Sequence, residues 1–161
     1  MGCGKSSVGR LVAARLGLPF FDLDERVVAD AGAAVSRIFS LEGEPAFRAR
    51  ERAALIALAP ELSAGAVIAT GGGTTSDPDL GAWMSKRGTL IWLDARLEEI
   101  DNRVVSDGSR PLFGDRAARE RLYEDRRPGY ERSHHRIDTT DRTLDEVVQL
   151  VATVVLVPPE K

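Results

Sequence analysis

Apolar residues fall into two alternating patterns along the chain, one typical of strands and the other of helices. Four short apolar or β-branched runs are typical of buried strands. Longer segments, in which apolar residues recur every three or four positions, separate these runs. The alternation predicts an α/β fold with a parallel sheet. The predicted strands are Leu18 to Phe21, Ala66 to Ala69, Thr89 to Leu93 and Arg136 to Thr139.

The best-bounded helix is predicted over Ser6 to Leu16. Its apolar residues follow helical spacing, and Gly17 followed by Pro19 ends it. The same spacing recurs in five later segments, which we therefore also expect to be helical. These segments are Asp24 to Ala31, Glu44 to Leu62, Leu97 to Ser106, Arg116 to Arg127 and Leu144 to Val155.

A stretch at about residues 107–116 lacks any period. It contains two glycines, a proline and a serine, which predicts a loop of the length that often forms a mobile lid. With 161 residues, of which 43% are hydrophobic, the chain has the size and apolar content of one domain, residues 1–161.

Composition narrows the classes of partner and the compartment. The net charge of −3 gives no basic excess for binding nucleic acid or an anionic membrane. No apolar run approaches the roughly 18 to 20 residues of a membrane span, and the first residues do not resemble a signal peptide. The single cysteine, Cys3, can form neither an internal disulfide nor a zinc site alone. We therefore expect a cytoplasmic protein without nucleic-acid or membrane partners.

The first residues contain the second half of a phosphate-loop motif, which is Gly, four residues, Gly, Lys, then Ser or Thr. Glycines let backbone N–H groups turn toward phosphate oxygens, and the following helix adds its positive dipole end. Lys5 would meet the β and γ phosphates of ATP, and the Ser6 hydroxyl would face Mg²⁺. A glycine-rich turn that only caps a helix is the alternative. The predicted nucleotide-binding residues here are Gly2, Cys3, Gly4, Lys5, Ser6 and Ser7.

A phosphate loop normally follows a buried strand, and no such strand precedes the loop in this sequence. In a parallel α/β sheet that first strand would lie at the centre, bury both faces and anchor the loop. We therefore expect the central strand to be absent from this chain, and we hypothesise that the natural start lies upstream.

Two carboxylates, Asp22 and Asp24, stand at the carboxyl end of a predicted strand. Open α/β sheets bind ligands at this edge. In an extended segment residues two apart point to the same side, so one carboxylate could face Mg²⁺ and the other a substrate hydroxyl. Alternatively, both serve only to cap the helix that follows.

Further motifs appear in a specific order along the rest of the chain. Arg48 and Glu51 lie in a predicted helix, a triple glycine follows the second strand, Arg110 lies in the lid, and Arg126 precedes a Pro-Gly-Tyr segment. Together with Gly-Lys-Ser and Asp-Leu-Asp, these motifs resemble the shikimate kinase family along nearly the whole chain. The resemblance implies a P-loop kinase with the three-layer fold of nucleoside-monophosphate kinases and a mobile lid.

The resemblance also implies roles for residues on the phosphate side. Lys5 and Ser6 match the phosphate and magnesium positions, and Asp22 matches the acid that holds magnesium through water. Asp24 matches the acid that binds the acceptor hydroxyl and is the candidate general base. Arg110 matches the lid arginine that closes over the phosphates, a role worth roughly 10³ to 10⁵ in rate.

On the substrate side, the resemblance assigns Arg48 and Arg126 to the shikimate carboxylate. Two arginines suit this role because a planar guanidinium holds a carboxylate through two parallel hydrogen bonds, although either could instead be a solvated helix charge. Arg142 matches a loop beside adenine, where the family often has proline at the position of Leu144. The residues expected to offer backbone N–H groups to the substrate are Gly71, Gly72 and Gly73.

The interpretation that unites these features is a monomeric shikimate kinase that uses ATP and Mg²⁺. It would transfer the γ-phosphoryl group of ATP to the 3-hydroxyl of shikimate. A gluconate-type or other small-metabolite kinase would keep Lys5 and Ser6 but need different acceptor contacts. A nucleotide-binding module that has lost catalysis is the third alternative, motivated by the absent strand.

Overall fold

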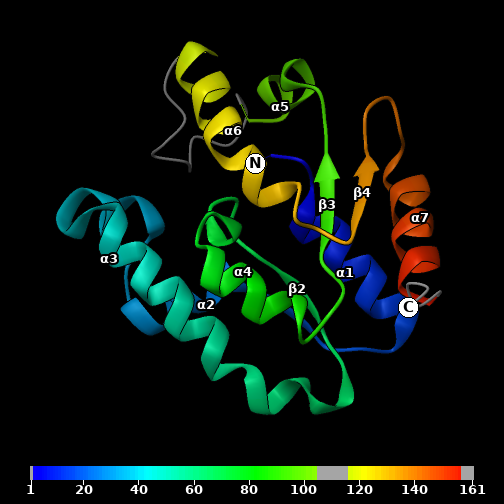
Figure 1. The fold of residues 1–161 in the computed structure, drawn as a ribbon, viewed down its shortest axis with the longest axis horizontal. Helices are drawn as coiled ribbons and strands as arrows, with labels where there is room; N and C mark the ends of the chain where they lie inside the picture. Colours follow the sequence, from blue (N-terminus) through cyan, green and yellow to red (C-terminus); the bar gives the residue numbers. More distant parts are fainter. Residues whose placement is uncertain (1, 105–115, 157–161) are drawn as a thin grey trace.

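The computed structural model describes residues 2–104 and 116–156, and Figure 1 shows their arrangement. Helices and strands alternate as the sequence predicts. The strands are β1 Phe20–Asp22, β2 Val67–Ala69, β3 Ile91–Asp94 and β4 His135–Asp138. The α-helices are α1 Lys5–Leu16, α2 Leu23–Ala31, α3 Val35–Ala57, α4 Pro78–Ser85, α5 Leu97–Val104, α6 Arg116–Tyr130 and α7 Leu144–Leu156. Two short 3₁₀ helices, η1 Ala59–Ala64 and η2 Thr74–Ser76, complete the described elements.

All four predicted strands are confirmed within two residues at each end, and the predicted helix Glu44 to Leu62 has the right start but ends too late. Helix α3, Val35–Ala57, consists of two helices joined across a kink at Gly43, whose φ of 80° and ψ of 173° are not helical. The second helix therefore begins after Gly43, with Pro45 in its first turn, and the first helix, from Val35, was not predicted. At the other end the chain continues as the 3₁₀ helix η1, which has proline in its first turn.

Helix α4 was not predicted, although its start has a clear signal. The Asp77 side chain accepts hydrogen bonds from the backbone N–H groups of Asp79 and Leu80 at 3.0 and 3.1 Å. Pro78 then occupies the first helical position, where proline is favoured. The predicted lid lies outside the described residues, as does Arg110, and only its last residue, Arg116, is seen, at the start of α6.

The four described strands form two separate parallel pairs. Strand β1 pairs with β2 in the register Phe20↔Val67, and β3 pairs with β4 in the register Ile91↔His135. No strand in the described part of the chain joins β2 to β3. In Figure 1, β3, β4 and α7 therefore lie on one side of the molecule, and α2 and α3 lie on the other.

Each strand pair has its own hydrophobic core. One core contains apolar residues of α1, β3, β4 and α7, including Val12, Leu93 and Val148. The other contains residues of α2, α3 and α4, including Leu23, Ile38 and Leu55. Helix α1 packs against α7 and against β2, so it bridges the two halves.

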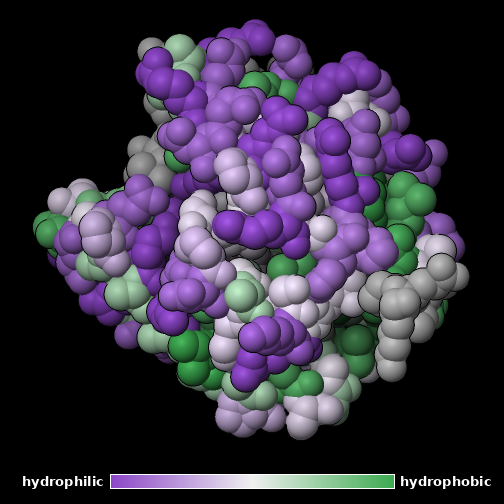
Figure 2. Space-filling model, viewed as in Figure 1, coloured by the Kyte–Doolittle hydropathy of each residue, from purple (hydrophilic) through white to green (hydrophobic). Residues whose placement is uncertain are grey.

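The surface in Figure 2 is mostly hydrophilic, with an apolar area over α7. That helix exposes Leu144, Leu150 and Leu156. In the described ranges, no helix combines the length and apolar content needed to cross a membrane.

Candidate functional site

The loop that begins the described chain ends in a left-handed glycine, Gly4, with φ of 85°. The backbone N–H of Val8 donates to the Gly4 carbonyl at 2.9 Å, so helix α1 starts directly after the loop. Because Gly4 has no side chain to cap the helix, the first N–H groups of α1 are left for a ligand. Ser6 and Ser7 lie exposed on this first turn. This geometry suits the phosphate cradle that the motif predicts.

Cys3 is buried within this loop, 5% exposed. The Lys5 Nζ lies 3.9 Å from the Cys3 Sγ. Burial alone would raise the pKa of the thiol, but nearby positive charge, including that of Lys5, lowers the pKa to about 7. The loop is therefore an electropositive environment, as an anion site requires.

Ser6 and Asp22 meet at the carboxyl end of β1. The Ser6 hydroxyl donates to the Asp22 Oδ2 at 2.5 Å. The other carboxylate oxygen accepts from the backbone N–H groups of Asp24 and Glu25 at 3.0 and 3.4 Å. Asp22 therefore caps α2 with one carboxylate oxygen and accepts from Ser6 with the other. Capping the helix and binding Mg²⁺ are thus compatible roles for this residue.

This pair suits a hard cation that also binds nucleotide phosphates. Hydroxyl and carboxylate oxygens are ligands that Mg²⁺ accepts, and Mg²⁺ usually takes one or two carboxylates together with phosphate oxygens. Over residues 2–104 and 116–156, no group of three or more His, Cys, Asp or Glu side chains could hold a metal by itself. A metal at Ser6 and Asp22 would therefore share its coordination with the nucleotide.

Asp24 lies in the first turn of α2, half-buried, next to the fully buried Leu23. The amino end of a helix favours the ionised carboxylate. Asp24 therefore has the position of an acid that can accept a proton from a bound hydroxyl.

Arg48 is fixed between two carboxylates of its own helix, α3. Its Nη1 lies 2.5 Å from the Glu51 Oε2, and its Nη2 lies 2.7 Å from the Glu44 Oε1. Glu51 is 1% exposed and also accepts a hydrogen bond from the Thr74 hydroxyl at 2.7 Å. Burial alone would lower the pKa of Arg48, but Glu51 and Glu44 raise it above its usual value. The side chain is 26% exposed, so it is not a solvated helix charge.

The predicted glycine segment packs directly against this ion pair. A Cβ atom at Gly71 would lie 2.0 Å from the Glu51 Oε1, and one at Gly73 would lie 2.4 Å from the Arg48 Nη2. A side chain at either position would therefore displace the carboxylate of Glu51 or the guanidinium of Arg48. The Gly72 carbonyl accepts a hydrogen bond from the Tyr130 hydroxyl at 2.6 Å, which joins the loop to α6.

Arg126 is the buried arginine of α6, 7% exposed, and its Nη2 lies 4.0 Å from the Glu44 Oε1. Its neighbour Arg127 is about half exposed and pairs with Glu131, which lies just beyond the end of the helix. Arg48 and Arg126 therefore converge on one carboxylate, that of Glu44. The structure brings together the two arginines that the sequence assigned to a carboxylate.

Two tyrosines on the same face of α6 as Arg126 anchor the helix. The Tyr123 hydroxyl donates to the Asp94 Oδ1 at 3.0 Å, and Tyr130 donates to the glycine loop. Burial and the charge of Asp94 raise the pKa of Tyr123 to about 12, so its hydroxyl stays a donor. Neither Tyr123 nor Asp94 was predicted from the sequence. Helical spacing of Tyr123, Arg126 and Tyr130 was the available signal.

Arg142 lies in the turn between β4 and α7, exposed, with its Nε donating to the Asp138 carbonyl at 3.0 Å. This turn follows the carboxyl end of β4, on the edge of the sheet where the phosphate loop also lies. Its role beside adenine remains a prediction.

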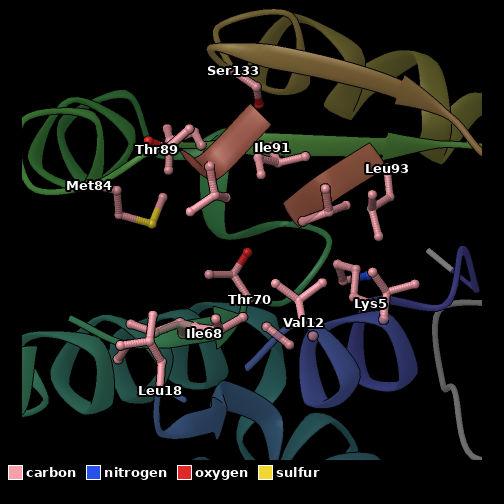
Figure 3. A pocket seen from close by; sticks show the side chains of 18 of the residues that line it. Lys5, Val12, Leu18, Ile68, Thr70, Met84, Thr89, Ile91, Leu93 and Ser133 are labelled. Atoms are coloured by element: carbon pink, nitrogen blue, oxygen red, sulfur yellow. The ribbon is translucent and has the colours of Figure 1, made fainter. Parts of the chain in front are cut away.

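A small cavity of about 60 Å³ connects the two loops of the site. Its walls include Cys3 and Lys5 from the phosphate loop, Gly71 and Gly72 from the glycine loop, and Tyr130 from α6. Phosphate-binding and substrate-binding candidates therefore face the same space. A larger cavity, of about 250 Å³, lies between β2 and β3. Lys5 also contributes to its walls (Figure 3).

Comparison with known proteins agrees with this geometry. The family model of shikimate kinase matches residues 1–155. Shikimate kinase from Symbiobacterium thermophilum is 46% identical over 154 residues, 92% of this chain and 87% of that protein. The one from Geobacter metallireducens is 38% identical over 151 residues, 92% of this chain and 83% of that protein.

Solved structures agree as well. The structure of shikimate kinase from Acinetobacter baumannii in complex with shikimate superposes with a TM-score of 0.86 at 31% identity. The match covers 97% of this chain and 88% of that one. The chain therefore belongs to the shikimate kinase family, whose members transfer phosphate from ATP to shikimate.

Proposed function

We propose that Arg48 and Arg126 hold the carboxylate of shikimate while the chain transfers the γ-phosphoryl group of ATP to the 3-hydroxyl. The position of Glu44 carries this proposal. Its carboxylate lies 2.7 Å from Arg48 and 4.0 Å from Arg126, so the two guanidinium groups already enclose a carboxylate. A substrate carboxylate at the same place would satisfy both arginines.

The phosphate side uses the start of α1. Lys5 and the N–H groups of the first turn bind the β and γ phosphates, where the helix dipole favours negative charge. Gly2 and Gly4 allow the loop backbone to approach the phosphates, and we assign the predicted lid residue Arg110, which lies outside the described residues, to the same phosphates. We place adenine beside the turn that contains Arg142.

Asp24 acts on the acceptor hydroxyl. The 3-hydroxyl oxygen of shikimate forms a bond to the γ-phosphorus, the bond from that phosphorus to the β–γ bridging oxygen breaks, and ADP leaves. The hydroxyl proton passes to the Asp24 carboxylate. Most of the acceleration comes from positioning and charge stabilisation, which explains why the site is built mainly from cations and backbone N–H groups.

Ser6 and Asp22 are the residues that would hold Mg²⁺. Their oxygens already lie 2.5 Å apart, and Asp22 is fixed in place by two backbone N–H groups. The ion would neutralise charge on the β and γ phosphates when bound. In its absence the same hydrogen bond keeps the end of β1 close to the phosphate loop.

We further propose that the enzyme is a cytoplasmic monomer. The net charge of −3 and the single cysteine support this compartment and the absence of polyanionic partners. Size-exclusion chromatography with light scattering measures the oligomeric state directly, and a dimer mass would contradict the proposal.

The decisive experiment measures magnesium-dependent ADP release with shikimate and, in parallel, with gluconate. We expect shikimate-specific turnover, and in Arg126→Met a strongly raised KM for shikimate with an unchanged KM for ATP. Arg127→Met is the matched control, because this neighbouring arginine is about half exposed and its ion pairs are with Glu124 and Glu131. Equal effects of the two variants on the shikimate KM would refute the carboxylate clamp.

A further inference from the structure

Helix α6 packs against η2, the 3₁₀ helix that directly follows the glycine loop. A Cβ atom at Gly129 would lie 2.6 Å from the Thr75 carbonyl oxygen, which is a backbone atom, so the helix and η2 touch through their backbones. The same carbonyl accepts a hydrogen bond from the Arg132 Nη2 at 3.0 Å, two residues beyond the helix. The segment 71–76 therefore fixes the position of the carboxyl end of α6.

Tyr130, the last residue of α6, makes a polar contact inside the candidate site. Its hydroxyl donates to the Gly72 carbonyl at 2.6 Å. Burial raises the pKa of Tyr130, although the charge and the hydrogen bond of the Arg126 guanidinium oppose this rise. A phenolic hydroxyl can donate one hydrogen bond and accept another. One oxygen atom therefore joins Arg126 to the backbone of the glycine loop.

Aromatic neighbours hold the ring that carries this hydroxyl. The Trp92 ring of β3 stacks on the Tyr130 ring, with centroids 5.7 Å apart and planes 30° apart. The Tyr123 ring, two turns earlier on α6, lies 6.4 Å away by the same measure. Aromatic rings attract each other at these separations. The ring of Tyr130 is therefore fixed independently of its hydroxyl.

The glycine loop is also anchored on the side of α3. The Thr74 hydroxyl, one residue after the loop, donates to the Glu51 Oε1 at 2.7 Å, and Glu51 pairs with Arg48. Arg48 and Arg126 belong to different helices, so their relative placement depends on what joins those helices. One connection runs through the loop, with Thr74 at the Arg48 end and Tyr130 at the Arg126 end.

We propose that Tyr130 is a positioning residue for the shikimate carboxylate, whose hydroxyl sets the direction of the Arg126 guanidinium relative to the glycine loop and to Arg48. This inference rests on the proposed function of the two arginines as a carboxylate clamp. A guanidinium holds a carboxylate through two parallel hydrogen bonds only when the two planes match. Without the hydroxyl, Arg126 keeps its charge but loses part of that alignment.

The test is Tyr130→Phe, which keeps the ring that stacks on Trp92 and removes only the hydroxyl. We expect the shikimate KM to rise about tenfold, the size of losing one hydrogen bond to a charged group, while kcat and the ATP KM stay unchanged. Tyr123→Phe is the matched control, because it removes a hydroxyl from the same face of α6 that donates instead to Asp94. An equal rise of the shikimate KM in Tyr123→Phe would overturn the proposal, since general loosening of α6 would then explain both.

A double-mutant cycle with Arg126→Met shows whether Tyr130 acts through Arg126. In the Arg126→Met background, we expect Tyr130→Phe to change the shikimate KM by less than about twofold. A full tenfold rise there would overturn the proposal, as would an unchanged KM in Tyr130→Phe alone. The Arg126→Met single variant separates the two hypotheses. If it leaves the shikimate KM unchanged, the clamp itself is refuted, whereas a raised KM without an effect of Tyr130→Phe refutes only the positioning role.

Discussion

The half of the molecule that contains α2, α3, β1 and β2 differs from the half that contains β3, β4 and α7 in how its functional groups are held. In the first half, which we call the acceptor half, Arg48 is fixed by the buried Glu51, and Glu51 is fixed by Thr74. In the second, the nucleotide half, the phosphate loop depends on the backbone of Gly4 and on the start of α1. The acceptor site is therefore preorganised by side chains, and the phosphate site by backbone.

The two halves also differ in their relation to the cavity between β2 and β3. The Arg48 network lies within the acceptor half, on the side of α3 that faces the glycine loop. Lys5 instead forms part of the wall of this cavity. Substitutions in the Arg48 network should therefore change shikimate binding alone, whereas substitutions in the phosphate loop should change nucleotide binding alone.

The largest effect is expected from Glu51→Ala. This substitution leaves Arg48 with only Glu44 and leaves the Thr74 hydroxyl without its carboxylate acceptor. Breaking a buried ion pair costs about 3–5 kcal/mol, and we expect about 3 because Arg48 is partly exposed. Urea unfolding measures this loss. Glu42→Ala, which removes the exposed Glu42–Arg50 pair, is the control and should cost under about 1 kcal/mol.

Gly73→Ala separates substrate binding from stability more sharply. The added methyl group would lie 2.4 Å from the Arg48 Nη2, so the guanidinium must move. A displacement of this kind can cost about 10²-fold in activity, and we expect it to raise the shikimate KM while the ATP KM stays constant. Gly88→Ala is the control, because no atom lies within 4 Å of its added methyl group. A parallel rise of both KM values would show that the two halves are not independent.

The sequence predicts the contacts between residues that are close along the chain better than the contacts between distant residues. Gly4, Lys5 and Ser6 form a local motif, and Asp22 stands two residues before Asp24, so their grouping follows from short spacing alone. Only the family resemblance singled out Arg126, because local spacing does not distinguish it from Arg127 and its burial depends on how α6 packs against the glycine loop.

Long-range contacts were the least predictable. Tyr123 and Asp94 are 29 residues apart and meet only because α6 lies against the end of β3. The break at Gly43 is the opposite case, since glycine followed by Pro45 has the local appearance of a helix boundary and the backbone is indeed non-helical there.

In the nucleotide half, Ser6→Ala tests the predicted magnesium position. It removes the hydroxyl that donates to Asp22 but leaves the carboxylate capped onto α2. We expect the magnesium concentration for half-maximal rate to rise about tenfold or more, with the shikimate KM unchanged. Ser7→Ala is the matched control on the same exposed turn. If Ser7→Ala raised the magnesium requirement as much, Ser6 would have no special role.

The smallest effect, and the most informative for the clamp, is expected from Glu44→Gln. The Glu44 carboxylate lies 2.7 Å from Arg48 and 4.0 Å from Arg126, so it competes with the substrate carboxylate for the same guanidinium groups. A neutral amide of the same shape weakens this competition, which increases the fraction of binding-competent enzyme and lowers the shikimate KM severalfold. Steady-state kinetics measure the change, with Glu42→Gln as an exposed control. A raised KM would instead show that Glu44 orients Arg48 for the substrate, and the internal carboxylate would then be part of the binding site rather than its competitor.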